Sequence, residues 1–117
     1  QEHGFDGINL DWNYPSGQAE RTKFTELCKE LRTAFTIQSL LLTASVSGMK
    51  TIIDDGYEVS LIAPELDFIN VLTYNFHSST ESATAHHSPL SSNPSDTLTT
   101  ARICNDLLGD SRWGSTA

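Results

Sequence analysis

Three polar side chains recur two residues apart along one strand-like run of the sequence. The run extends from Phe5 to Trp12, and its polar positions are Asn9 and Asp11, followed by Asn13 just past its end. Side chains alternate between the two faces of a strand, so these three share one face near the carboxyl end. That end carries the active site in parallel sheets and barrels. Inward polar groups also need hydrogen-bond partners. Two interpretations therefore stay open: a face that binds or reacts, or a polar network that only fixes the strand.

The elements that would position these residues alternate between strands and helices. Strand-like runs cover Phe5–Trp12, Leu40–Val46 and Leu66–Tyr74. Apolar residues at helical spacing predict helices near residues 19–35 and 51–62, the second broken by Gly56, and a last helix capped by Asp96 and stopped by Gly109. The strands begin roughly 30 residues apart, the length of a βαβ unit. The order predicts an α/β fold with a parallel sheet, either a small open fold or a slice of a barrel.

Composition and isolated residues exclude some functions. The net charge of −8 argues against nucleic acid and anionic membrane surfaces as partners, and no apolar run approaches the ~20 residues of a membrane span. Cys28 and Cys104 fall on apolar helix stripes and are expected to be free thiols, although a single bridge stays open. The adjacent His86 and His87 lie in a polar loop and predict no metal site. Trp12 faces the helices by parity, which predicts core packing.

Several segments together resemble the family-18 glycoside hydrolases, the chitinases and chitinase-like lectins. That family carries Asp-x-x-Asp-x-Asp-x-Glu followed by Tyr-Pro, and residues 4–15 read GFDGINLDWNYP. The similarity continues in residues 41–47 (LLTASVS), in residues 66–77 (LDFINVLTYNFH) and in residues 87–90 (HSPL). These segments keep the family's order over nearly the whole chain.

The resemblance implies that the chain is part of a (β/α)8 TIM barrel, about strands 4 to 6 with their helices. A complete barrel needs about 250 residues, so residues 1–117 are expected to be a piece of a single catalytic-type domain, either a fragment or a natural truncation. An open slice of barrel leaves sheet edges unpaired, which predicts self-association. Residues 110–117, which include Trp113, show no periodicity and are expected to form a disordered tail.

The resemblance also implies roles for individual residues. Asp11 matches the Asp that orients the substrate's acetamide, and Tyr74 matches the tyrosine that steadies it. Tyr14 is a candidate for stacking on sugar, and Asp6 matches an outer structural Asp. Three positions depart from the family pattern, and all three are asparagines: Asn13 stands in place of the acid Glu, whereas Asn9 and Asn75 each stand in place of an Asp.

The departures decide the expected function. An amide cannot give up a proton at physiological pH, so the acid position, Asn13, is expected to be lost. The leading hypothesis is a secreted, non-catalytic, lectin-like protein that binds chitin or N-acetylglucosamine oligomers through Asp11, Tyr14, Tyr74 and Asn75, with no cofactor or metal. The alternatives are a weakly active chitinase, with Asp11 as a substitute acid, and an interaction or structural fragment without a sugar site.

Overall fold

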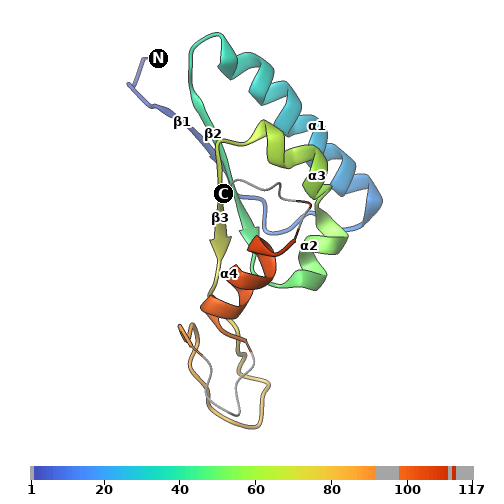
Figure 1. The fold of residues 1–117 in the computed structure, drawn as a ribbon, viewed down its shortest axis with the longest axis vertical. Coiled ribbons are helices and arrows are strands. Elements are labelled where there is room, and N and C mark those ends of the chain that lie inside the picture. Colours follow the sequence, from blue (N-terminus) through green and yellow to red (C-terminus); the bar gives the residue numbers. More distant parts are fainter. Residues whose placement is uncertain (1, 92–97, 111, 113–117) are drawn as a thin grey trace.

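The computed structural model describes residues 2–91, 98–110 and 112. Its sheet has three strands in the order β1-β2-β3: β1 (Gly7–Leu10), β2 (Leu41–Ser47) and β3 (Phe68–Leu72). Both neighbouring pairs are parallel. Helices α1 (Gly17–Thr36), α2 (Lys50–Gly56) and α3 (Val59–Ile62) lie together on one side of the sheet, and a 3-10 turn, Ala63–Glu65, leads into β3 (Figure 1). The predicted parallel α/β arrangement is confirmed.

The core lies between the sheet and these helices. Leu10, Ala44 and Val46 face it from β1 and β2, since every second side chain of a strand points to the same face. They meet buried apolar side chains of the helices and of the segments next to them: Phe24, Cys28, Ile53, Tyr57, Val59 and Ile62. Trp12 packs against the same cluster, with its ring centroid 6.3 Å from that of Phe24. The prediction that Trp12 belongs to the core is confirmed.

Both cysteines are free thiols, as expected from their places on helix stripes. Cys28 is buried under the sheet, whereas Cys104 on α4 (Thr100–Leu108) is partly exposed. Burial is the main cause that raises the pKa of Cys28 to about 11, and the nearby Glu65 adds to it. The Cys28 thiol therefore stays protonated and unreactive at neutral pH.

The ends of the elements differ from the sequence prediction. The first and third strands are shorter than the runs Phe5–Trp12 and Leu66–Tyr74, because the paired residues end at Leu10 on β1 and at Leu72 on β3. Gly56 breaks the second predicted helix, as expected, since Tyr57 after it is extended. The last helix begins at residue 100, and its cap is Thr99, whose hydroxyl accepts the Arg102 N–H at 3.2 Å. Asp96, the predicted cap, lies outside the described residues.

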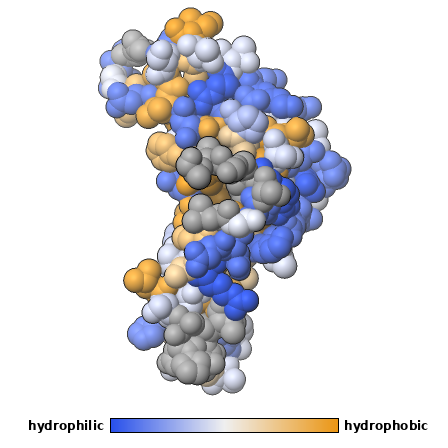
Figure 2. All heavy atoms as spheres, in the orientation of Figure 1, coloured by the Kyte–Doolittle hydropathy of each residue, from blue (hydrophilic) through white to orange (hydrophobic). Residues whose placement is uncertain are grey.

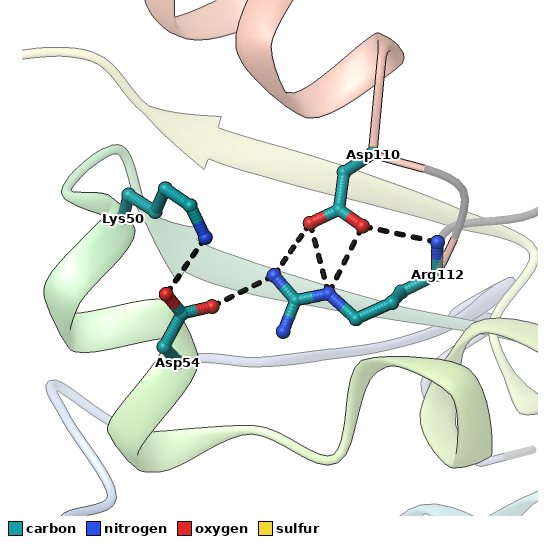
Figure 3. Close-up of polar contacts among 4 residues, drawn as sticks. All are labelled: Lys50, Asp54, Asp110 and Arg112. Atoms are coloured by element: carbon teal, nitrogen blue, oxygen red, sulfur yellow. Dashed lines mark hydrogen bonds and ion pairs between the residues drawn. The ribbon is translucent and has the colours of Figure 1, made fainter.

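An ion-pair cluster includes Asp110 and Arg112, two residues of the segment 110–117 that the sequence predicts to be a disordered tail. Arg112 donates to the carboxylates of Asp110 and Asp54, and Asp54 also accepts from Lys50 at 2.7 Å (Figure 3). Hydrogen bonds from Arg112 hold the pKa of Asp110 down at about 2. The cluster joins α2 to Asp110 and Arg112 after α4. These residues are far apart in the sequence, so hydrophobic periodicity could not predict their contact. Residue 111 and residues 113–117, with Trp113, lie outside the described residues.

The face of the sheet opposite the helices is open. Two large apolar side chains on it are solvent-exposed, Leu41 at 44% and Phe68 at 55%. In the space-filling view hydrophilic residues cover the helical side, and hydrophobic residues show along the side of the sheet (Figure 2). Within the described residues, β1 and β3 each pair with β2 alone, so each has one unpaired edge. Such edges and faces are sites of association.

We therefore expect the isolated 117-residue chain to self-associate. Pairing of the free edges of β1 and β3, together with burial of Leu41 and Phe68, would remove unsatisfied backbone groups and apolar surface from water. Sedimentation velocity at several protein concentrations checks this, with dimers or larger species expected to grow with concentration. A monodisperse monomer with a sharp, concentration-independent thermal transition would contradict it.

Candidate functional site

A hydrogen-bonded network crosses all three strands on the open face. The Asn9 side chain on β1 donates through Nδ2 to Ser45 Oγ at 2.9 Å. Its Oδ1 accepts from Thr43 Oγ1 at 2.8 Å and from Asn70 Nδ2 at 3.0 Å. Thr43 and Ser45 lie on β2 and Asn70 lies on β3. One amide thus joins three strands.

This network gives Asn9 a structural role. Thr43 and Ser45 are only 6% and 7% exposed, so their hydroxyls need partners inside the protein. Asn9 supplies a donor to one hydroxyl and an acceptor to the other, because an amide side chain carries both kinds of group. Of the two interpretations of the polar strand face, the strand-fixing network describes Asn9.

Asp11 and Asn13 are in a different situation. Both lie beyond the last paired residue of β1, and both are exposed. Leu10, before Asp11, and Trp12, between Asp11 and Asn13, both pack against the core, so the alternation of the strand continues past its end. Neither side chain makes a hydrogen bond to any residue in the part of the chain that the structure describes. Asp11 and Asn13 are therefore available to a ligand.

Tyr14 and Tyr74 come together near Asp11. Burial is the first cause that raises the pKa of Tyr14, followed by the hydroxyl of Tyr74 and the carboxylate of Asp11, which disfavour a further negative charge. Tyr74 is 48% exposed just after β3. Tyr74, from the segment after β3, thus lies close enough to the segment of Asp11 and Tyr14 after β1 to affect the charge of Tyr14.

Asn75 follows Tyr74 at the same end of the sheet. Its backbone lies in the left-handed region, with φ of 58°, a conformation that Asn tolerates better than most residues. Its side chain is exposed and makes no hydrogen bond to the residues that the structure covers. Asn75 is thus an exposed amide near the carboxyl end of β3, next in the chain to Tyr74.

The loop that carries Asn13 and Tyr14 rests on the carboxyl end of α2. Asp55 Oδ2 accepts the Gly17 N–H at 3.0 Å. Gly56 lies so close to Pro15 that a Cβ atom at Gly56 would be 2.2 Å from the Pro15 carbonyl oxygen. Only glycine permits this approach. The carboxyl end of helix α2 therefore fixes the position of this loop relative to the sheet.

Tyr57 is a buried tyrosine near the loop that carries Asn13 and Tyr14, within the predicted helical stretch of residues 51–62. Its side chain is fully buried, and its hydroxyl has no hydrogen-bond partner among the described residues. Burial raises its pKa, and Tyr14 and Asp11 are the groups that add to this. Tyr57 belongs to the core cluster and follows Gly56, which packs against Pro15 of the loop. In the sequence, Tyr57 is a tyrosine among otherwise apolar residues at helical spacing, and this is the only sign of a buried hydroxyl there.

The histidines lie in the loop after β3. His77 Nδ1 contacts Glu81 Oε2 at 2.8 Å, whereas His86 and His87 are exposed. Across residues 2–91, 98–110 and 112, no group of three or more His, Cys, Asp or Glu side chains could hold a metal ion. No described helix is long and apolar enough to cross a membrane.

Comparisons with known proteins agree with the geometry. Residues 1–112 match the model of the glycosyl hydrolases family 18. The chain is 46% identical over 98 residues to Chitotriosidase-1 of Mus musculus, covering 74% of this chain and 21% of that protein. It is 46% identical over 100 residues to Chitinase-3-like protein 2 of Homo sapiens, covering 78% of this chain and 25% of that one.

A solved structure extends the likeness to three dimensions. Human YKL-39, described as a pseudo-chitinase with retained chitooligosaccharide binding properties, superposes with a TM-score of 0.82 at 38% identity over 92% of this chain. The superposition covers 33% of the YKL-39 chain. The chain thus spans about a fifth to a third of the proteins it matches, and its three strands correspond to part of their TIM barrel.

The network predicts how substitutions of Asn9 act on stability. Asn9→Ala leaves the buried hydroxyls of Thr43 and Ser45 without partners, so we expect the free energy of unfolding to fall by ~1–3 kcal/mol. Asn9→Asp is the matched control, since its carboxylate accepts from Thr43, Ser45 and Asn70, and the loss should be smaller at pH 7. The midpoint of urea denaturation checks both. Equal stability of Asn9→Ala and the unsubstituted chain would show that the network contributes nothing.

Proposed function

The chain belongs to family 18 of the glycosyl hydrolases, and from this membership we propose that it binds chitin-type oligomers of β-1,4-linked N-acetylglucosamine without hydrolysing them. The observation that carries the proposal is the residue at position 13. The match of residues 4–15 to the family motif puts Asn13 where the motif has its acid Glu. The proposed role of residues 1–117 is that of one segment of a single catalytic-type domain.

The missing acid matters because of how the family's reaction works. The substrate's acetamide attacks the anomeric carbon, an Asp orients that acetamide, and the Glu protonates the departing oxygen. General acid catalysis contributes ~10²–10⁴-fold to such a step. The Asn13 amide has two N–H donors, but it cannot release a proton at physiological pH. It is also one methylene shorter than Glu, so its hydrogen bond would fall short of the glycosidic oxygen.

The remaining side chains suit binding. Asp11 is an exposed carboxylate without a protein partner in the described residues, so it can accept the acetamide N–H. The rings of Tyr14 and Tyr74 offer apolar surface beside it, and the amides of Asn13 and Asn75 can both donate and accept. The sugar is neutral, so the net charge of −8 does not oppose it. Binding of this kind needs no cofactor.

The relatives are compatible with this proposal and with its main alternative. One is named a chitotriosidase, whereas YKL-39 is called a pseudo-chitinase that retains chitooligosaccharide binding. Because chitin is an extracellular polymer, we place the protein's action outside the cell. The alternative is residual hydrolysis with Asp11 as the acid. One carboxylate cannot orient the acetamide and protonate the leaving group together, which disfavours it.

Titration calorimetry with chitohexaose tests the binding. We expect saturable binding of chitohexaose and none of cellohexaose, which lacks the acetamides that Asp11 and Tyr74 would hold. Tyr74→Ala should weaken the affinity about tenfold or more, since truncation of a central aromatic residue has effects of this size. A chromogenic chitobioside should not be hydrolysed. Turnover of that substrate would favour the enzyme alternative, and absence of any chitohexaose binding would favour a segment without a sugar site.

Restoring the acid residue tests whether Asn13 is the only substitution that prevents hydrolysis. In Asn13→Glu the new carboxyl lies two residues from Asp11, whose charge should raise its pKa as an acid requires. Asn9, however, is engaged with Ser45, Thr43 and Asn70 and cannot share a proton with Asp11. We therefore expect little turnover from the single substitution, and clearly more when Asn9→Asp and Asn75→Asp are added, because such groups act as a unit.

Chitobioside hydrolysis is measured for the single and the triple variant, in this chain and with its residues grafted into a complete family-18 barrel. Asn9→Asp with Asn75→Asp, without the restored acid, is the matched control and should remain inactive. Equal activity of the single and triple variants would show that positions 9 and 75 do not cooperate with the acid.

A further inference from the structure

The segment from His87 to Leu90 is a strap fixed on two sides. On one side, the His87 carbonyl accepts the Phe76 N–H at 3.1 Å, and the Ser88 hydroxyl donates to the Thr73 carbonyl just after β3. On the other side, the first N–H groups of α4 donate to the strap: Thr100 to the Pro89 carbonyl at 2.9 Å and Ala101 to the Leu90 carbonyl at 3.0 Å. These helix N–H groups have no partner inside the helix, so the strap satisfies them.

The strap holds the His87 ring beside Tyr74. The centroids of the two rings are 6.4 Å apart, and their planes are inclined by 44°. Both side chains are exposed, so the pair forms surface and not core. The described part of the loop after β3 thereby folds back onto residues 73–76, and Figure 1 shows it projecting beyond the carboxyl end of the sheet.

From this geometry we infer that His87 is a further sugar-contacting residue, whose ring packs with that of Tyr74 against one pyranose of a bound N-acetylglucosamine oligomer. The inference rests on the proposed function and deepens it. Aromatic rings pair favourably with apolar faces, and a pyranose presents its axial C–H groups as such a face. Hydrogen bonds to the backbone of Thr73 and Phe76 hold the His87 segment beside Tyr74, so the two rings are positioned before a ligand binds, which lowers the entropic cost of binding.

The other loop histidines do not share this arrangement. His77 is turned to Glu81, which its Nδ1 contacts at 2.8 Å. His86 is adjacent to His87 and equally exposed, but it makes no ring contact with any residue in the described ranges. The backbone hydrogen bonds of the strap therefore bring His87, and not His86, next to Tyr74. His86 provides a matched control.

Titration calorimetry of the full chain with chitohexaose tests the inference. We expect His87→Ala to weaken the affinity three- to tenfold, the effect of losing one ring contact. His86→Ala should bind as the unsubstituted chain does. His87→Phe keeps a ring on the strap and should retain most of the affinity. Circular dichroism of each variant verifies that the fold is unchanged, as expected for an exposed side chain.

Each outcome bears on a definite claim. An affinity of His87→Ala equal to that of the unsubstituted chain overturns the inference, and so does an equal loss in His86→Ala, which would indicate a general effect of the loop. A loss in His87→Phe as large as in His87→Ala overturns the ring-packing role. If Tyr74→Ala weakens binding but His87→Ala does not, the proposed function stands and this inference alone fails. If the unsubstituted chain binds no chitohexaose, both fail.

Discussion

The amide of Asn9 is the interaction on which the arrangement of the site depends. Through three hydrogen bonds it connects β1 to two side chains of β2 and to one of β3. A parallel sheet with one buried face already resists a shift in register, because a shift by one residue turns every side chain to the wrong face. The Asn9 network adds a specific polar match on the opposite face. It therefore fixes how far Asp11, after β1, and Tyr74, after β3, extend beyond the sheet.

The two faces of the sheet carry different kinds of side chain. Leu10, Ala44 and Val46 pack against the helices, while the other face carries polar groups at its centre and exposed side chains at its carboxyl end. Helix α2 belongs to both: its residues build the core, and its end supports the loop through Gly56 under Pro15. The loop of Asn13 and Tyr14 is thus held in place by packing within the protein itself.

The proposed loss of catalysis is a change of chemistry within a retained frame. The chain keeps the strand order and register that its family membership implies, and it keeps a carboxylate at position 11 and tyrosines at positions 14 and 74. Amides at positions 9 and 75 preserve the size of an Asp side chain, and the amide at position 13 is one methylene shorter than Glu. All three can hydrogen-bond, but none of them carries an acidic proton. Binding a neutral sugar needs shape and hydrogen bonds, whereas cleaving it needs a proton donor. The same frame can serve the first without the second.

The sequence by itself determined the parallel α/β fold, the order of its elements and the residues gathered at the strand ends, because hydrophobic periodicity and a dense family motif are local signals. It also predicted that Trp12 is in the core and that Cys28 is a free thiol. Only the tertiary structure decided which polar residue of the first strand is structural, because the partners of Asn9 lie 34 to 61 positions away in the sequence. The buried hydroxyl of Tyr57, the contact of Arg112 with Asp54 and the ring of His87 beside Tyr74 likewise depend on long-range packing. No local pattern encodes those contacts, because they arise only when distant segments meet.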